Sequence, residues 1–237
     1  MLLNELSFCQ FSGMLFDYPL RESINGREIS MKTSALLVSI ILLIFIEGMF
    51  LSSSAQWIPH EIDTNTHYYM GSRVADMDDD GDVDIISAFY MRDSVCWYEN
   101  ENLTWKKHTI KANIDGPIWP VPADIDQDGD LDFVIQGNWE NIVVWYENNL
   151  PDTVWNEHII DPFLYGAEYV DVTDFDDDGD LDVAAVGWFA NSVVWYENNN
   201  LSWQEYIIDD DLAGAVTLVA SDIDDDGDPD IVASGSE

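Results

Sequence analysis

Residues 76–84 read DMDDDGDVD, and the same pattern returns three more times along the chain. The copies are DIDQDGDLD at 124–132, DFDDDGDLD at 174–182 and DIDDDGDPD at 222–230. Each copy has a carboxylate at every second residue and a glycine at the sixth place, where the backbone can take a conformation that a side chain resists. Because Ca²⁺ is bound by about six to eight oxygen atoms, a short loop of this composition can curl around one such ion.

The acidic copies allow two other interpretations. A run of acidic residues is commonly a solvated surface or a disordered tail, but random drift would not keep four copies in one ligand register. An EF-hand needs an acidic residue at position 12 of its loop. The residues at that position are Ser87, Ile135, Ala185 and Ala233, and the flanking segments are short and β-like. The EF-hand interpretation is therefore rejected.

The composition of the chain bounds its class and its partners. The chain has 237 residues, of which 47% are hydrophobic, so it can build a globular core. Its net charge of −39 repels nucleic acid and anionic membranes, so we exclude both as partners of the repeats. The two cysteines, Cys9 and Cys96, define no disulfide framework.

The N-terminal part differs from the rest of the chain. Residues 1–30 show no periodicity, and we predict that they are unstructured upstream sequence that has been read through, with Met31 as the true start. A basic start, an apolar run from Ala35 to Ile46 and small residues before Gln56 predict a signal peptide over residues 31–55. An uncleaved N-terminal membrane anchor is the alternative, although Glu47 interrupts the apolar run before the ~20 residues of a spanning helix.

Residues 56–237 form a tandem repeat with units at 57–104, 105–154, 155–202 and 203–237. A Trp-x-x-His/Tyr-x-Ile motif begins at Trp57, Trp105, Trp155 and Trp203, in steps of 48, 50 and 48 residues. A second motif, ending in Trp-Tyr-Glu-Asn, occupies 95–100, 143–148 and 193–198. A period near 48 with several short strands per unit predicts an all-β propeller or a related β array.

Each unit has four strand-like segments, and in the first full unit these are 72–75, 83–90, 94–99 and 105–110. The acidic loop joins the first segment to the second. Pro117, Pro120 and Pro122 in the next unit place its first strand at a sheet edge, because proline lacks the N–H of a β-ladder. We therefore expect four-stranded blades with the first strand innermost. The chain holds about three and a half such blades, so we expect an incomplete propeller whose remainder lies in missing C-terminal sequence.

These motifs resemble the FG-GAP repeat family, in the variant called VCBS repeat, whose relatives include the head domain of integrin α chains. The resemblance covers 57–237 and implies a propeller that is commonly seven-bladed, with one Ca²⁺ in each acidic loop. By analogy with such loops, places 1, 3, 5 and 9 supply carboxylates, place 7 supplies a backbone carbonyl, and place 4 points outward. The Phe-Gly and Gly-Ala-Pro motifs that named the family are absent from this sequence or only partly matched.

This analogy gives the candidate metal ligands and a cofactor prediction of up to four structural Ca²⁺ ions. The candidates are Asp76, Asp78, Asp80, Asp82, Asp84, Asp124, Asp126, Asp128, Asp130, Asp132, Asp174, Asp176, Asp178, Asp180, Asp182, Asp222, Asp224, Asp226, Asp228 and Asp230.

The other recurring side chains are interpreted as framework. Trp97, Trp145 and Trp195 recur in register, as inter-blade packing requires, and so do the histidines of the first motif and the glutamates of the second. Non-repeated Trp119, Trp139 and Trp188 are better candidates for ligand contact. No catalytic residue and no other cofactor is predicted.

The sequence therefore predicts a secreted or surface-exposed, calcium-stabilised propeller module that binds an extracellular protein or glycan and has no catalysis of its own. Two alternatives remain open. The chain is then either the propeller part of a secreted carbohydrate-active enzyme of the lyase or dehydratase type, or a purely architectural segment. Contact with a membrane is expected only through an uncleaved N-terminal segment.

Overall fold

The computed structural model describes residues 8–9, 58–64, 69–151 and 154–236, and it divides into two compact units, 1–64 and 65–237. In the first unit, β1 (Phe8–Cys9) pairs in parallel with β2 (Pro59–His60). The predicted signal peptide, Trp57 and all but β1 of the predicted read-through segment lie outside the described residues. Among the residues that are described, no helix is long and apolar enough to cross a membrane.

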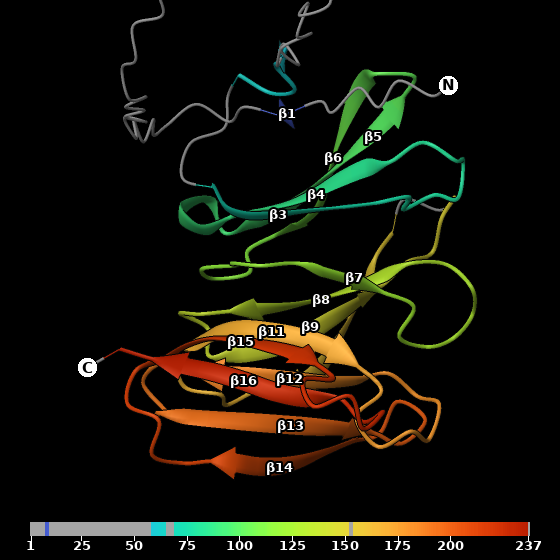
Figure 1. The fold of residues 1–237 in the computed structure, drawn as a ribbon. Helices are drawn as coiled ribbons and strands as arrows, with labels where there is room; N and C mark the ends of the chain where they lie inside the picture. The colour runs from blue at the N-terminus through green and yellow to red at the C-terminus, as the bar shows by residue number, and fades with distance from the viewer. Residues whose placement is uncertain (1–7, 10–57, 65–68, 152–153, 237) are drawn as a thin grey trace, which may run out of the picture. The chain divides into compact units, whose positions relative to one another are not determined.

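The second unit is built from antiparallel sheets in which each strand pairs with the next one in sequence (Figure 1). Blade 1 consists of β3 (Tyr69–Ala75), β4 (Asp84–Phe89), β5 (Ser94–Glu101) and β6 (Thr104–Ala112), with a 3-10 turn η1 (Tyr90–Arg92) between β4 and β5. Blade 2 consists of β7 (Val121–Ala123), β8 (Asp132–Gly137), β9 (Ile142–Glu147) and β10 (Asn156–Asp161). Blade 3 consists of β11 (Ala167–Thr173), β12 (Asp182–Gly187), β13 (Ser192–Asn198) and β14 (Trp203–Asp209). A two-stranded sheet follows, with β15 (Ala215–Ser221) and β16 (Asp230–Gly235).

This architecture is an incomplete β-propeller of four-stranded blades, as the sequence predicted. The first strands of successive sheets contact one another, β3 with β7, β7 with β11 and β11 with β15, as innermost strands do. The proline-rich first strand of blade 2 is confirmed as an edge strand. Only Val121–Ala123 pair with β8, and Pro117 adds an isolated bridge to Gly137, because the prolines interrupt the ladder.

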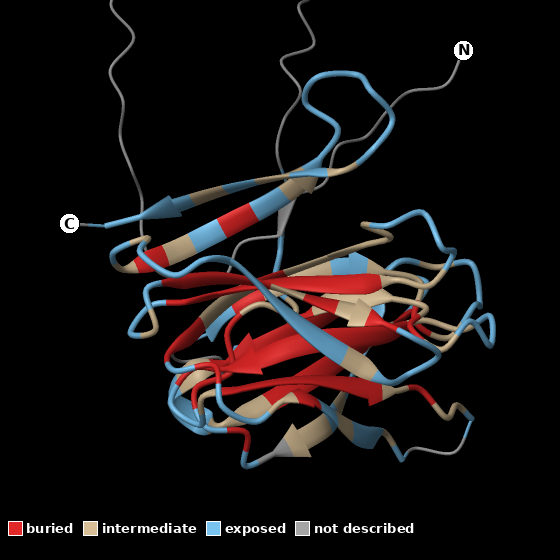
Figure 2. Cartoon of the chain, turned by 90° about the horizontal axis from the view of Figure 1, so that it is seen from below, coloured by how far each residue is buried: buried red, intermediate tan, exposed pale blue. Residues whose placement is uncertain are grey.

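The second strand of each blade forms the centre of the core. Every residue of β4, β8 and β12 is buried, and Figure 2 shows these strands between more exposed edges. A strand that is covered on both faces carries a nearly continuous apolar run in place of strict alternation. The segments 84–89 and 182–187 have this composition, and β12 packs against blade 2 on one face and against β15 on the other.

Alternate residues of a strand face different neighbours, because side chains point to opposite faces with a period of two. Phe133 and Ile135 of β8 join Ile86 and Ala88 of blade 1 in one core cluster. Val134, between them, joins a second cluster with residues of blade 3. Blades 2 and 3 are therefore each one layer of two adjacent cores.

The blades are also joined by hydrogen bonds at the ends of their hairpins. Asn141 and Asn191 end the tight turns between the second and third strands, with left-handed φ values of 62° and 55°. Their side-chain Oδ1 atoms accept the backbone N–H groups of Gly166 and Gly214, each at 2.8 Å. Both glycines directly precede the first strand of the next sheet. The turn of one blade therefore holds the start of the following sheet in place.

We predict that Phe133→Ala lowers the free energy of unfolding by about 3 to 5 kcal/mol, the usual cost of deleting a buried aromatic ring. Phe133 is fully buried and its ring lies 5.0 Å from that of Tyr146 and 5.3 Å from that of Trp155. Urea unfolding followed by tryptophan fluorescence measures the change. Leu103→Ala, at an exposed hairpin, is the control and should change it by no more than about 0.5 kcal/mol. Equal effects of the two variants would contradict the packing described.

Candidate metal centres

Each acidic copy is the loop between the first and second strands of a blade. We call residues 76–84, 124–132, 174–182 and 222–230 acidic loops 1 to 4, and count places 1 to 9 within each. The loops join β3 to β4, β7 to β8, β11 to β12 and β15 to β16, and place 9 is the first residue of the second strand. The β-ladder therefore positions one end of every loop.

The structure brings together the carboxylates at places 1, 3 and 9 of each loop. In each triad, one carboxylate oxygen from every residue lies within 4.8 Å of the other two. The triads are Asp76, Asp78 and Asp84; Asp124, Asp126 and Asp132; Asp174, Asp176 and Asp182; and Asp222, Asp224 and Asp230. Three converging anionic oxygens repeated in every blade can hold a metal ion.

The residue at place 1 also closes the loop onto its own backbone. In loop 3, Asp174 accepts the N–H of Asp178 at 3.2 Å and that of Gly179 at 3.0 Å, and loops 1 and 4 repeat this pair of bonds. The glycine at place 6 has φ between 93° and 104° in all four loops, and an added Cβ there would meet no atom within 4 Å. The glycine is therefore required by its backbone conformation.

The residue at place 9 is buried in loops 1 to 3 and is held there by two segments. Asp182 has no exposed surface, and its Oδ1 accepts the N–H of Asn198 at 2.8 Å while its Oδ2 accepts that of Phe175 at 3.0 Å. The side chain of Asn198 in turn donates to the carbonyl of Leu181. Loops 1 and 2 repeat these contacts through Asn100 and Asn148. Sequence reasoning missed this role of the asparagine, although its position directly after the recurring glutamate was a signal.

The predicted ligands at places 5 and 7 lie outside the triads. The carboxylate at place 5 accepts the N–H of place 7, as between Asp80 and Asp82 at 2.8 Å. The carboxylate of Asp82 accepts the N–H of Asn102 at 3.0 Å. In loops 1 and 3 the place 5 and place 7 side chains therefore shape the loop and its contact with the neighbouring hairpin.

Burial and mutual repulsion oppose ionisation of the loop carboxyls. Burial raises the pKa of Asp132 to about 7 and, followed by repulsion from Asp128 and Asp126, raises that of Asp130 to about 6. Burial also raises the pKa of Asp78 and of Asp182. Both protons and cations relieve this repulsion, so the loops are poised to bind a cation when the carboxylates are charged.

Unpartnered oxygen atoms also fit a cation. Among the described residues, one buried carboxylate oxygen of each of Asp78, Asp124 and Asp130 accepts no hydrogen bond. A buried acceptor without a donor is costly. An ion in loop 1 would satisfy the oxygen of Asp78, and an ion in loop 2 would satisfy that of Asp124. The donor set of carboxylate oxygens suits a hard divalent cation.

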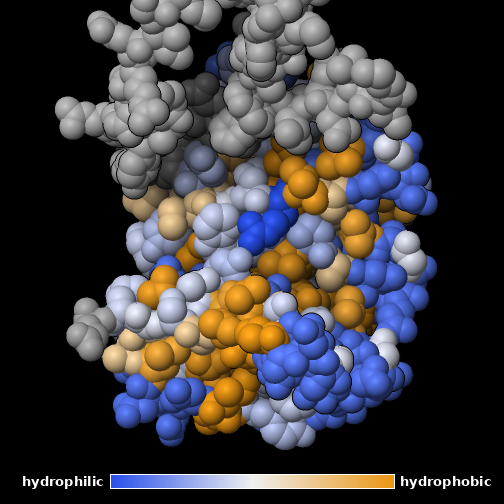
Figure 3. All heavy atoms as spheres, in the orientation of Figure 1, coloured by the Kyte–Doolittle hydropathy of each residue, from blue (hydrophilic) through white to orange (hydrophobic). Residues whose placement is uncertain are grey.

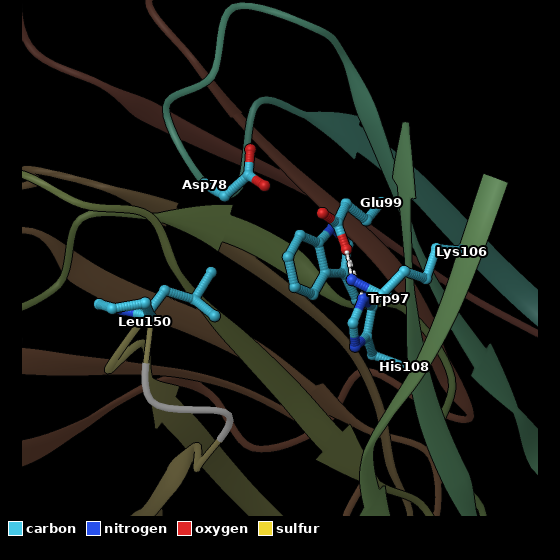
Figure 4. Close-up of a pocket in the computed structure, with 7 residues that line it drawn as sticks. Asp78, Trp97, Glu99, Lys106, His108 and Leu150 are labelled. Carbon is cyan, nitrogen blue, oxygen red and sulfur yellow. Dashed lines mark hydrogen bonds and ion pairs between the residues drawn. The ribbon is translucent and has the colours of Figure 1, made fainter. Parts of the chain in front are cut away.

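The recurring Trp, His and Glu side chains form a stacked support beside each loop. In blade 1 (Figure 4), the ring of His108 stacks on Trp97 at 4.6 Å and its Nε2 lies 2.6 Å from Oε2 of Glu99. The ammonium group of Lys106, at 2.7 Å, and then His108 hold the pKa of Glu99 below its usual range. With Asp78, Leu150 and Pro151, these residues line a cavity of about 460 Å³.

Blades 2 and 3 repeat the stacked support with one exchange. His158 stacks on Trp145 at 4.3 Å and contacts Glu147 at 2.7 Å. In blade 3, Tyr206 takes the place of the histidine, stacks on the half-buried Trp195 at 4.8 Å and donates to Glu197 at 2.7 Å. A tyrosine preserves the stacking and the hydrogen bond, so the geometry accords with a framework role for these side chains.

The predicted ligand-contact residues differ in their surroundings. Trp119 is half-buried against Arg73 and Tyr169 near the innermost strands, whereas Trp139 and Trp188 lie on exposed hairpins. Figure 3 shows the hydrophobic and hydrophilic surface on one side of the molecule. Sequence reasoning missed an aromatic group formed by Phe163, Tyr165 and Phe189, because its non-repeated candidates were all tryptophans.

The missed aromatic side chains border a groove between blades 2 and 3. Phe163 is 85% exposed, and the rings of Tyr165 and Phe189 lie 5.1 Å apart. The groove has a volume of about 340 Å³, with a buried apolar floor formed by Leu164 and Val194. Its remaining lining residues are Asp161, Ala190, Ser192, Glu205, Ile207 and Asp210.

The four-stranded blades carry an aspartate triad in the loop between their first and second strands. The protein is therefore a β-propeller with a candidate metal site in each of these loops. The family model described as "FG-GAP-like repeat" matches residues 76–135, 124–185 and 174–233, and the chain belongs to that family. No curated protein matches the chain. One similar solved structure is the Vibrio cholerae biofilm matrix protein Bap1, with 16% identity and a TM-score of 0.40. That match covers 70% of this chain and 28% of the matrix protein.

A pair of variants in loop 3 separates scaffolding from metal binding. In the presence of a chelator, we predict that Asp182→Ala lowers the free energy of unfolding by about 2 to 4 kcal/mol, because it leaves one buried and one partly buried N–H group without an acceptor. Asp176→Ala should be neutral or slightly stabilising under the same conditions, because it removes a carboxylate repelled by Asp178 and Asp174. Chemical denaturation in EDTA provides the measurement. Equal destabilisation by the two variants would contradict this division of roles.

Proposed function

We propose that this chain is a calcium-stabilised β-propeller module that works outside the cell, binds a protein or glycan ligand and has no catalysis of its own. The observation that carries the proposal is the repetition of the aspartate triad at the same place in every blade. A site that recurs with the structural repeat serves the repeat, so we assign the metal a structural role. The predicted signal peptide supports an extracellular location.

Calcium is the cation that these loops suit best. All the triad donors are carboxylate oxygens, and irregular loops of backbone and carboxylate oxygen accommodate the flexible coordination of Ca²⁺. Mg²⁺ demands near-octahedral geometry and keeps several of its waters. Extracellular modules function with weak sites of about 10⁻⁴ to 10⁻³ M, because calcium is abundant outside cells.

The ion would act on the fold by neutralising charge between two strands. In loops 1 to 3, place 9 lies at the start of a fully buried strand, while places 1 and 3 lie on the loop that leads into it. A cation bound by all three fixes the loop to the strand and offsets the repulsion among the carboxylates. One ion in each loop would stabilise all four strand connections.

The ligand surface is assigned to the aromatic groove between blades 2 and 3. Exposed rings that contribute little to the core are common at binding sites, and aromatic residues are enriched there. The corresponding positions in the neighbouring segments are Asn113 with Asp115 and Asp211 with Ala213, so Phe163 and Tyr165 are specific to this one groove. Residues 112–237 contain no lysine or arginine, which favours a neutral or basic ligand over an anionic one.

The structural role of calcium predicts a large effect on thermal unfolding. At calcium concentrations about ten times the dissociation constant, each filled loop adds about 1.4 kcal/mol. For a chain of this size, four filled loops should raise the melting temperature by roughly 10 to 20 °C relative to EDTA. Differential scanning calorimetry of the full chain with Ca²⁺, with Mg²⁺ and with EDTA measures the shift. An unchanged melting temperature in calcium would refute the structural role.

The ligand surface predicts a second, independent result. In a screen of immobilised glycans and extracellular matrix proteins in calcium, the wild-type chain should bind at least one component. The double variant Phe163→Ala, Tyr165→Ala should lose at least about ten-fold in affinity for it, the effect expected of binding hot spots. Leu103→Ala, which removes an exposed apolar side chain from a hairpin of blade 1, is the control and should keep full binding. Full binding by the double variant would place the ligand elsewhere.

A further inference from the structure

One side chain of acidic loop 2 reaches acidic loop 3. Gln127, at place 4 of loop 2, donates from Nε2 to the carbonyl oxygen of Gly179 at 2.6 Å and to Oδ1 of Asp180 at 3.0 Å. These acceptors are places 6 and 7 of loop 3. The other oxygen of Asp180 accepts the N–H of Asn200 at 3.0 Å. Asp180 is therefore held on one side by its own blade and on the other by the preceding one.

The other loops lack the means to make this contact. Place 4 is Asp79 in loop 1, Asp177 in loop 3 and Asp225 in loop 4. An ionised carboxylate has no proton to donate to a carbonyl or to another carboxylate. Within the described ranges, neither Asp79 nor Asp177 makes a hydrogen bond to the loop that follows. Loops 2 and 3 are thus the pair that a place 4 side chain connects.

The backbone at place 4 is left-handed, a conformation that disfavours glutamine. Gln127 has φ of 60°, and Asp79, Asp177 and Asp225 have similar values between 55° and 61°. This left-handed region is several-fold enriched in Asn and Asp, whose short side chains bond locally. Glutamine is longer and lacks that local compensation. Its contact with the next loop supplies a physical reason for a glutamine at this position.

The position of Gln127 makes its side chain sensitive to the state of loop 2. It lies between Asp126 and Asp128, places 3 and 5, so closure of loop 2 around an ion fixes its backbone. Its amide then holds the peptide that joins Gly179 to Asp180, and the carbonyl of Asp180, at place 7, is an expected oxygen ligand of loop 3. Asp126, Gln127 and Asp180 also line one shared cavity of about 190 Å³.

We propose that Gln127 couples cation binding in acidic loop 2 to cation binding in acidic loop 3, so that an ion in either loop raises the affinity of the other. This inference rests on the calcium binding proposed above. The coupling is reciprocal, because linkage requires each ion to change the affinity of the other by the same factor. Two hydrogen bonds at an exposed site correspond to a factor of about five to ten, near the lower end of known couplings.

The test follows each loop separately by NMR. The full chain is labelled with ¹⁵N-glycine, and the amides of Gly81, Gly129, Gly179 and Gly227, at place 6 of loops 1 to 4, report occupancy while CaCl₂ is added. Asp124→Ala, which removes a triad carboxylate from loop 2, should raise the calcium midpoint of Gly179 about five-fold or more. The midpoint of Gly81 should stay within about two-fold of wild type, since loop 1 has no such contact.

A second variant isolates the glutamine itself. Gln127→Asn keeps an amide and tolerates the left-handed backbone, but its side chain is too short by one carbon to reach loop 3. It should weaken calcium binding at Gly179 by about five-fold while Gly129 still responds. Combined with Asp124→Ala, it should add nothing further, as expected for two changes that break one coupling. Asp177→Asn is the matched control at place 4 of loop 3 and should leave the Gly227 midpoint within about two-fold.

The results distinguish a failure of the coupling from a failure of the calcium binding on which it rests. A Gly179 midpoint that stays within about two-fold of wild type in Gln127→Asn overturns the coupling and leaves calcium binding intact. The same holds if Asp124→Ala leaves Gly179 unaffected. Absence of any response to calcium at the four glycines overturns both the coupling and the structural role of calcium.

Discussion

The structure depends on bringing three carboxylates together where the first strand of a blade turns into the second. One of them, at place 9, begins a fully buried strand and is anchored by two backbone N–H groups, as Asp182 shows. The other two approach it on a loop whose own hydrogen bonds leave little freedom. Such a convergence is electrostatically unfavourable without a counter-ion, so the loop geometry suits a bound cation.

The carboxylate triad recurs because each pair of neighbouring sheets encloses a similar hydrophobic core. Blades 2 and 3 each pack their two faces against different neighbours, so a second strand displaced at its first residue would disturb two cores at once. The aspartate at place 9 and the asparagine that supports it therefore act at the base of the whole blade. The stacked Trp, His or Tyr and Glu side chains extend this support to the outer strands, beside the same loop.

The sequence predicted the features that recur and not those that depend on contacts between repeats. The acidic loops, the four strands per unit and the proline-bearing edge strand follow from spacing and from the chemistry of single residues. The bond from Gln127 to loop 3 could not be predicted, because no sequence rule gives the distance between two loops of different blades. The exposure of Phe163 and Tyr165 likewise depends on which neighbouring strands leave a groove, and a propensity argument would have buried both rings.

The most direct measurement is the position of the cation itself. In a crystal of the full chain grown in millimolar CaCl₂, anomalous scattering from calcium locates every bound ion without reference to stability. The account predicts one peak in each acidic loop, within bonding distance of the carboxylates at places 1, 3 and 9. Loops that contain only water under those conditions, or peaks that lie away from the triads, would contradict it.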